Sequence, residues 1–145
     1  MHGTYCLVVD VTEASSVRVG SLGVRKFPAG IYVYVGSALS GIEKRVSRHK
    51  SVKKKRRWHI DYLLDKAEVL SVIAIPTERK STECEIFHAL ASCEGASVPV
   101  DGFGSSDCKC KSHLVCFGSA DREWVAEVIS MRLSMLESAY PRKTG

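Results

Sequence analysis

The sequence predicts an α/β fold in which a small β-sheet is covered by helices. The first observation is a strictly alternating segment at residues 30–36, which is typical of a strand. The second is a series of segments whose apolar residues recur at helical spacing. The third is their order along 145 residues: strand, hairpin, strand, two helices, strand, helix, strand and helix, without a repeat or linker. This order favours one domain over residues 1–145, with a core at about 3–117 and a last helix at about 120–138.

The central strand carries two tyrosines on one face. Alternation in residues 31–35 puts apolar side chains on one face and the phenols of Tyr32 and Tyr34 on the other. The strand ends at Gly36. From Leu39 to Lys50 the apolar residues recur every three or four positions, which predicts a helix directly after the strand.

Arg45 and His49 stand one helical turn apart, beside the apolar stripe that contains Ile42 and Val46. We therefore expect both side chains to lean toward the strand. Arg45 could instead be a surface arginine, and a histidine at a helix end is often only a favourable end charge. Because His49 can accept a proton at neutral pH, this junction of strand and helix is the most chemically suggestive part of the chain.

The other elements follow from the same two periodicities and from turn residues. Tyr5 stands in a first strand rich in β-branched residues. Thr82 and Glu85 can form a capping box at a helix start, and Ser119 is a candidate N-cap for the last helix. The predicted elements are strands at 5–11, 69–75 and 112–117, a hairpin with strands at 17–19 and 24–27, and helices at 58–67, from 81, and at 121–138.

Glu83 is the best candidate for a metal ligand on sequence grounds alone. It lies one turn before Phe87 and two turns before Leu90, so its carboxylate falls on the buried face of its helix, whereas Glu85 faces solvent. A buried carboxylate costs several kcal/mol unless it is paired or coordinated. Arg45 or a divalent cation would supply that partner, and both alternatives stay open.

The composition is that of an ordinary globular protein. Hydrophobic residues make up 45% and charged residues 26%, which excludes a mainly disordered chain. The absence of Asn and Gln favours a thermophile, although a biased genome would also produce it. No apolar stretch has the length of a membrane span and the first residues do not resemble a signal peptide, so we expect a cytoplasmic protein. The net charge of +5 includes a dense basic run, which favours an anionic partner but is explained almost as well by a solvated loop. This run contains Lys53, Lys54, Lys55, Arg56 and Arg57.

The six cysteines do not suggest a disulfide framework in a protein expected to be cytoplasmic. The segment with Cys108, Cys110 and His113 has one residue between its cysteines, which is the wrong spacing for a zinc knuckle, and no partner half is evident. We expect a surface loop with incidental cysteines there, and zinc is disfavoured. The cysteines expected to be small buried hydrophobes are Cys6, Cys84, Cys93 and Cys116.

Two short motifs resemble those of the GIY-YIG nuclease superfamily. They are Gly3-Thr-Tyr5 on the first strand and Tyr34-Val-Gly36-Ser37 on the central one. The Arg45 and His49 pair of the next helix and an acidic residue on a later helix match as well. From about Gly3 to Phe117 the chain is similar to an archaeal branch of that superfamily, a domain of unknown function. The segments typical of the branch are Trp58–Leu64 and Gly102–His113.

The resemblance implies a central, mostly antiparallel sheet flanked by helices, and hydrolysis of phosphodiester bonds with one Mg²⁺ or Mn²⁺ ion. It implies that Tyr5 and Tyr34 position or deprotonate water, with His49 as a rival base. It further implies that Arg45 neutralises the scissile phosphate and that Glu83 binds the metal. The implied partner is nucleic acid, with DNA favoured over RNA. Binding of a protein partner and formation of a homodimer both stay open.

The chain departs from the superfamily pattern in two ways. The connection between the two motifs is longer than usual, and the Asn that often follows the metal-binding Glu is missing. Gly30-Ile-Tyr32 is not the first motif, because it directly adjoins the second, so Tyr32 is expected to be structural. The alternatives are a non-catalytic nucleic-acid-binding module and a structural or assembly protein. The assembly protein would dock a partner on one side of its last helix, through Trp124, Val128, Met131 and Met135.

Further residues could extend the site. His59 and Asp61 lie in a segment typical of the branch, but they are equally explained as ordinary residues of a helix start. Ser105, Ser106 and Asp107 could place backbone amides near a phosphate. The accessory candidates are Gly36, Ser37, His59, Asp61, Ser105, Ser106, Asp107 and His113.

Overall fold

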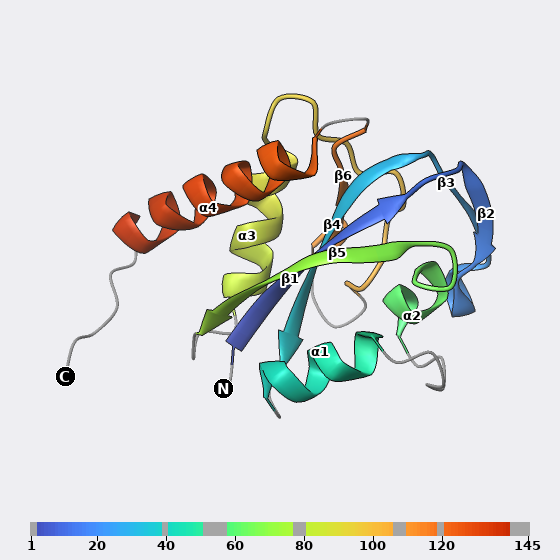
Figure 1. Ribbon diagram of the computed structural model, residues 1–145, viewed down its shortest axis with the longest axis horizontal. Helices are drawn as coiled ribbons and strands as arrows, with labels where there is room; N and C mark the ends of the chain where they lie inside the picture. The colour runs from blue at the N-terminus through green and yellow to red at the C-terminus, as the bar shows by residue number, and fades with distance from the viewer. Residues whose placement is uncertain are drawn as a thin grey trace.

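A four-stranded antiparallel sheet with the strand order β5–β1–β4–β6 forms the centre of the protein (Figure 1). The computed structural model describes residues 3–38, 41–50, 58–76, 81–105, 110–118 and 121–139. The strands of the sheet are β1 (Gly3–Val11), β4 (Gly30–Ala38), β5 (Glu68–Pro76) and β6 (Leu114–Cys116). The predicted α/β fold with an antiparallel sheet is therefore confirmed.

Helices cover both faces of this sheet. A separate hairpin, β2 (Ser15–Arg18) and β3 (Val24–Phe27), lies at one end of the molecule with α2 (Figure 1). The 3₁₀ turn η1 (Gly20–Leu22) connects its strands, as the glycines of that segment predict. α1 and α2 lie on one side of the sheet, and α3 and α4 lie on the other (Figure 1). The helices are α1 (Ile42–Lys50), α2 (His59–Leu63), α3 (Thr82–Ala91) and α4 (Arg122–Ala139).

Alternation along the strands divides the core into two layers. Tyr5, Leu7 and Val9 of β1 share one layer with Tyr32 and Tyr34 of β4. The intervening residues of both strands face the opposite layer, where α3 and α4 pack. Because both faces are buried, the period of two in the sequence decides which layer each side chain enters. The predicted faces of both strands are thus confirmed.

The pairing of β1 with β4 brings the two motif tyrosines together. Tyr5 stands opposite Gly36, and Leu7 stands opposite Tyr34. Tyr5 and Tyr34 therefore lie on the same face in diagonal positions, and their ring centroids are 6.3 Å apart.

The ends of several elements differ from the predictions. α2 ends at Leu63, four residues before the predicted end, because the backbone turns there before β5 begins at Glu68. β6 is shorter than the predicted residues 112–117, although His113 and Phe117 on either side of it still form backbone hydrogen bonds with β4.

The helix caps also differ. Thr82 is a buried first residue of α3 and not its cap, and Ser81, in the cap position, donates its hydroxyl to the Glu85 carboxylate at 3.1 Å. The Ser81 side chain makes no capping hydrogen bond to the backbone, so the predicted capping box of Thr82 and Glu85 is wrong. At the start of α4, the Asp121 carboxylate accepts the Glu123 N–H at 2.7 Å. Ser119, the predicted cap there, lies outside the described residues.

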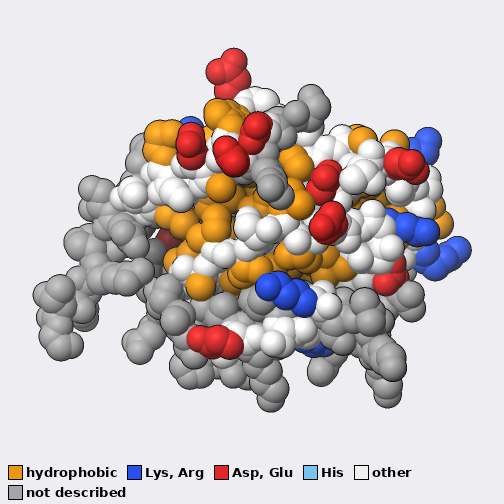
Figure 2. Space-filling view, in the orientation of Figure 1, with side chains coloured by type: hydrophobic (Ala, Val, Ile, Leu, Met, Phe, Trp, Pro, Cys, Tyr) orange, Lys and Arg blue, Asp and Glu red, His pale blue; other side chains and the backbone are white. Residues whose placement is uncertain are grey.

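α4 buries only part of its apolar surface. Val128 packs into the core layer beneath the helix, so its predicted place on an exposed docking side is wrong. Trp124 and Met131 are exposed, and Figure 2 shows hydrophobic side chains gathered on this face between α4 and β5. The side chain of Met135 is not among those described. In the part of the chain that the structure describes, no helix is both long and apolar enough to span a membrane.

Candidate active site

A short hydrogen bond between β1 and α1 is the centre of the candidate site. The Tyr5 hydroxyl lies 2.6 Å from Nε2 of His49, and the two rings are 5.5 Å apart. Tyr5 is 1% exposed and His49 is 3% exposed. His49 thus leans toward the sheet from the last turn of α1, as its position beside the apolar stripe predicts.

Tyr34 completes an aromatic triad with these two residues. Its ring lies 6.3 Å from that of His49 in an edge-on arrangement, and it is 8% exposed. Two glycines make room for the phenols. A Cβ on Gly36 would overlap the ring of Tyr5, and a Cβ on Gly104, whose φ is +68°, would come within 2.9 Å of Tyr34. The glycine of the second motif is therefore explained by sterics, since its own φ is not positive.

Trp58 carries two guanidinium groups against its indole ring. The Cζ atom of Arg45 lies 4.0 Å from the ring centroid, and that of Arg48 lies 3.9 Å from it. Trp58 also contacts the ring of His49 at 6.2 Å. Arg45 is therefore half-buried beside the triad, as its place on the helix predicts.

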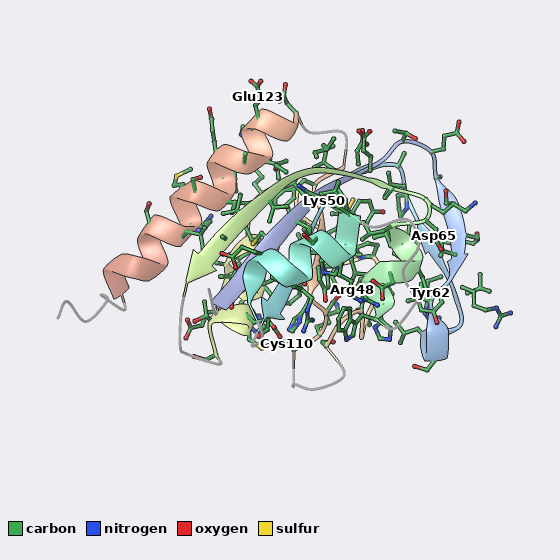
Figure 3. All side chains as sticks on the ribbon, turned by 60° about the horizontal axis from the view of Figure 1, so that its bottom comes forward. Arg48, Lys50, Tyr62, Asp65, Cys110 and Glu123 are labelled. Atoms are coloured by element: carbon green, nitrogen blue, oxygen red, sulfur yellow. A yellow bond between two sulfur atoms is a disulfide. The ribbon has the colours of Figure 1, made fainter. Side chains whose placement is uncertain are left out.

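Asp61 ties the start of α2 to α1. Its carboxylate is fully buried and accepts two hydrogen bonds from Arg48, at 2.8 and 2.9 Å, and one from the Trp58 backbone N–H at 2.9 Å. Arg48 lies on the side of α1 that faces α2 (Figure 3). Nδ1 of His49 lies 4.0 Å from Oδ1 of the same carboxylate. Asp61 thus stands behind His49, on the side away from Tyr5.

Burial raises the pKa of both motif phenols far above the ordinary value. For Tyr5, the nearby Tyr34 raises the pKa further, whereas the charge of Arg45 and a hydrogen bond from it act in the opposite direction. For Tyr34, the charge of Glu83 adds to the effect of burial, and Arg45 again lowers the pKa. Arg45 and Glu83 are thus within electrostatic reach of both phenols. The structure brings Tyr5, Tyr34, Arg45 and His49 together from β1, β4 and α1, and the charge of Glu83 acts on both phenols from α3.

Glu83 lies in the first turn of α3. The helix packs on the opposite face of the sheet, yet Oε1 of Glu83 lies 3.1 Å from Nδ1 of His113, next to the edge strand β6. The sequence nominates His113 as an accessory residue, but not as the partner of Glu83. Burial lowers the pKa of His113. The hydrogen bond between its ring and the Gly104 backbone has a smaller effect in the opposite direction, and the nearby His88 lowers the pKa slightly further.

Two cysteines lie beside this pair. Cys84 forms a disulfide with Cys110, so the prediction that Cys84 is a buried hydrophobe is wrong, and Cys110 is not incidental. The residues are 26 positions apart and meet only because α3 packs beside the segment before β6. Figure 3 shows Cys110 at the opposite end of the molecule from Glu123. The prediction of small buried hydrophobes holds for Cys6, Cys93 and Cys116, which are buried free thiols.

His59 supports the loop before β6. Its Nδ1 accepts the Gly104 N–H at 2.8 Å, and its ring packs on Phe103 at 5.7 Å. Burial lowers the pKa of His59, against a smaller raising effect of the hydrogen bond between its ring and the Gly102 backbone. Ser105 is buried in the same loop. His59 therefore holds in place the glycine on which the ring of Tyr34 rests.

Other predicted residues are placed differently or lie outside the described part of the chain. Ser37 is exposed at the end of β4. Tyr32 donates its hydroxyl to the Pro28 carbonyl at 2.6 Å, which agrees with a structural role. The nominated residues outside the described part are Lys53, Lys54, Lys55, Arg56, Arg57, Ser106 and Asp107.

Sequence reasoning missed Trp58, Arg48 and Gly104. The spacing of Trp58 and Asp61 is a usable signal, because a carboxylate at the third position of a helix often accepts the N–H of the cap residue. Arg48 had no such signal, since its partner belongs to the next helix. Gly104 is one of several glycines in its loop, and only the nearby ring of Tyr34 distinguishes it.

The sequence matches the model of a known protein family. The family model described as "Domain of unknown function DUF123" matches residues 4–134. This range includes Tyr5, Tyr34, Arg45, His49 and Glu83. Comparisons with curated proteins and with solved structures gave no match. The chain therefore belongs to the DUF123 family, a domain of unknown function.

Proposed function

We propose that this chain hydrolyses phosphodiester bonds in nucleic acid, as a DUF123 branch of the GIY-YIG superfamily from archaea. The observation that carries the proposal is the 2.6 Å hydrogen bond between Tyr5 and His49. It joins two proton-transfer groups from segments 44 residues apart, with a second phenol and an arginine beside them. Such a convergence is typical of general acid–base sites.

His49 is the better base of the rival candidates. The raised pKa of both phenols keeps them protonated at neutral pH, so neither Tyr5 nor Tyr34 is a ready base. With the Tyr5 O–H donating to Nε2, the neutral ring of His49 carries its proton on Nδ1, which faces Asp61 at 4.0 Å. Tyr5 would pass a proton from the attacking water to Nε2, and the carboxylate would stabilise the resulting imidazolium.

Arg45 is suited to bind the phosphate. Its guanidinium is half-buried against Trp58, and its charge reaches both phenols. A planar guanidinium can donate two parallel hydrogen bonds to phosphate oxygens. Stacking on the indole limits the freedom of this side chain, so less entropy is lost when it binds a substrate.

Glu83 fits a single Mg²⁺ ion. Mg²⁺ usually keeps several of its waters and needs only one or two carboxylates from the protein. The Glu83 side chain is 19% exposed, its charge acts on Tyr34, and its carboxylate lies 3.1 Å from the ring of His113. Ligating carboxylates commonly have such a hydrogen-bonded neighbour. When bound, the ion would stabilise negative charge on the phosphate oxygens.

Cleavage assays with matched variants test this proposal. The protein is incubated with labelled single-stranded, duplex and branched DNA and RNA, with Mg²⁺, Mn²⁺ or EDTA. We expect metal-dependent cutting that is lost in Glu83→Ala and His49→Ala and kept in Glu85→Ala, a control on the same helical turn. Cutting that survives in Glu83→Ala, or no cutting of any substrate, would overturn the proposal.

A nucleic-acid-binding module without catalysis is the second candidate. The burial of Tyr5, Tyr34 and His49 favours it, because a triad shielded from water can serve as a rigid core for a binding surface. This function predicts binding that is insensitive to EDTA and unchanged in Glu83→Ala. Binding measured in the cleavage reactions separates the two functions.

A further inference from the structure

Cys84 and Cys110 have no role in the proposed hydrolysis, and their side chains form a cluster with that of His113. One ligand atom from each lies within 4.8 Å of the others. Nε2 of His113 is 3.8 Å from Sγ of Cys84. The two cysteines are joined by a disulfide in this structure, so the cluster is seen in its oxidised form.

His113 is oriented as metal-binding histidines are. Its Nε2 faces the sulfur atoms, while its Nδ1 lies 3.1 Å from the Glu83 carboxylate. A histidine that ligates a metal almost always donates its other ring N–H to a carboxylate, a carbonyl or water. The His113 side chain is 2% exposed and packs beside Phe87 at 6.2 Å, so its orientation is constrained on several sides.

The backbone holds the segment that supplies two of these side chains. The N–H of His113 donates to the Phe103 carbonyl at 2.8 Å, and its carbonyl accepts from the Val35 N–H at 2.9 Å. The Gly102 N–H donates to the Lys111 carbonyl at 2.7 Å. These bonds fix residues 111–113 against the neighbouring loop and β4 without help from the disulfide. The ligands would therefore stay close together after reduction.

We propose that the reduced protein binds one Zn²⁺ ion through Cys84, Cys110 and His113, with Glu83 as the residue that orients His113. Two thiolates and one imidazole are the donors that zinc prefers, and three protein ligands leave a fourth position for water. The spacing of Cys108 and Cys110 alone disfavours zinc. The structure supplies the partner half that the sequence did not show, which is Cys84 on α3.

Binding requires the disulfide to be opened by two electrons. A phosphine reductant supplies them: the S–S bond breaks, the phosphine takes an oxygen atom from water, and two thiols form. Zn²⁺ then displaces the two thiol protons as the sulfurs become ligands. A peroxide reverses the process, since it accepts two electrons and two protons to become water while the two thiolates rejoin. The site thus holds metal only in the reduced protein.

Zinc and cobalt titrations of the whole chain test this site. Protein reduced with a phosphine should bind one Zn²⁺ per chain in competition with a chromogenic chelator, and peroxide-treated protein should bind none. Co²⁺ should give the thiolate-to-metal charge-transfer band and the intense visible bands of a tetrahedral site. Equal binding by the reduced and oxidised proteins, or none by either, would overturn the proposal without any substitution.

Variants then assign the ligands. We expect Cys84→Ser, Cys110→Ser and His113→Ala to abolish stoichiometric binding, and Glu83→Gln to weaken it by roughly 10- to 100-fold. Cys93→Ser, a buried free thiol two residues after the end of α3, is the control and should bind as the wild type does. Zinc bound as tightly by Cys84→Ser as by the wild type would refute the assignment. Because the readout is bound metal, the result does not depend on nuclease activity.

Discussion

Tyr5 lies directly opposite Gly36 in the pairing of β1 with β4, and its phenol ring occupies the space that a Cβ of residue 36 would need. The hydroxyl of that ring makes the 2.6 Å hydrogen bond to His49. The glycine of one strand thus decides where the phenol of the other can lie. The geometry of the candidate site depends on this pair, which leads to the first prediction.

Gly36→Ala should destabilise the protein by about 1–3 kcal/mol, because the added methyl group displaces the Tyr5 ring. Tyr5→Ala should remove the overlap, so the double variant should be more stable than the sum of the single effects predicts. Urea unfolding of the four proteins measures this coupling. Gly95→Ala is the control, since φ is +84° there and no atom lies within 4 Å of its Cβ. The effects of Gly95→Ala and Tyr5→Ala on the free energy of unfolding should be additive. If the effects of Gly36→Ala and Tyr5→Ala are additive as well, the steric explanation fails.

Arg48 and Arg45 form a matched pair, because both stack on Trp58 at nearly the same distance. Arg48→Ala should cost roughly 3 kcal/mol, since it leaves the buried Asp61 carboxylate without its two guanidinium hydrogen bonds. Arg45→Ala should cost about 1 kcal/mol, close to the contribution of one cation–π interaction, and should abolish cleavage while the fold survives.

Thermal melts with and without Mg²⁺, combined with the cleavage assay, check these values. A large loss of stability in Arg45→Ala, with no effect of Mg²⁺ on the wild-type melt, would make Arg45 the structural counter-charge of Glu83. It would also remove Glu83 as a Mg²⁺ ligand.

The protein should lose stability in alkali, and Tyr5 should account for part of the loss. Burial raises the pKa of Tyr5, so above about pH 10 the unfolded chain releases a phenol proton that the folded chain retains. The unfolded state then binds fewer protons, and the free energy of unfolding falls as the pH rises. Urea unfolding from pH 7 to 11 should show a shallower fall for Tyr5→Phe, with a constant difference between the two proteins below pH 9. A fall as steep as in the wild type would show that Tyr5 ionises normally in the folded protein.

Binding to nucleic acid should be mostly electrostatic if the basic run from Lys53 to Arg57 binds phosphates. Removing one lysine–phosphate ion pair should flatten the slope of log affinity against log salt by roughly 0.9 on duplex DNA. Fluorescence anisotropy at several salt concentrations measures this for a variant with Lys53, Lys54 and Lys55 changed to Ala. Arg18→Ala and Arg25→Ala in the hairpin of β2 and β3 serve as the charge control. If the affinity and the slope are unchanged in the triple variant, the basic run does not bind phosphates and is only a solvated loop.

Periodicity by itself determined which face each strand residue takes. Alternation placed Tyr5 with Leu7 and Val9 on one face of the first strand, and Tyr34 with Tyr32 on one face of the central strand. The helical stripe likewise placed Arg45 and His49 on the side of their helix that faces the protein, because these directions depend only on residues a few positions apart. The same reasoning placed Glu83 on the inner side of its helix, and it stands beside His113 there. These are local properties of the backbone, so a single sequence is enough to predict them.

The partners of these residues depended on the tertiary structure. The register that sets Tyr5 against Gly36, the carboxylate of Asp61 between two helices, and the meeting of Cys84 with Cys110 each join segments whose separation no short pattern encodes. The apolar residues around Cys84 in the sequence made it resemble a core residue. A cysteine that is buried and a cysteine that meets a second cysteine have the same local sequence pattern, and only the packing of α3 distinguishes them. Local spacing decides the direction of a side chain, but long-range packing of the whole chain decides what it meets.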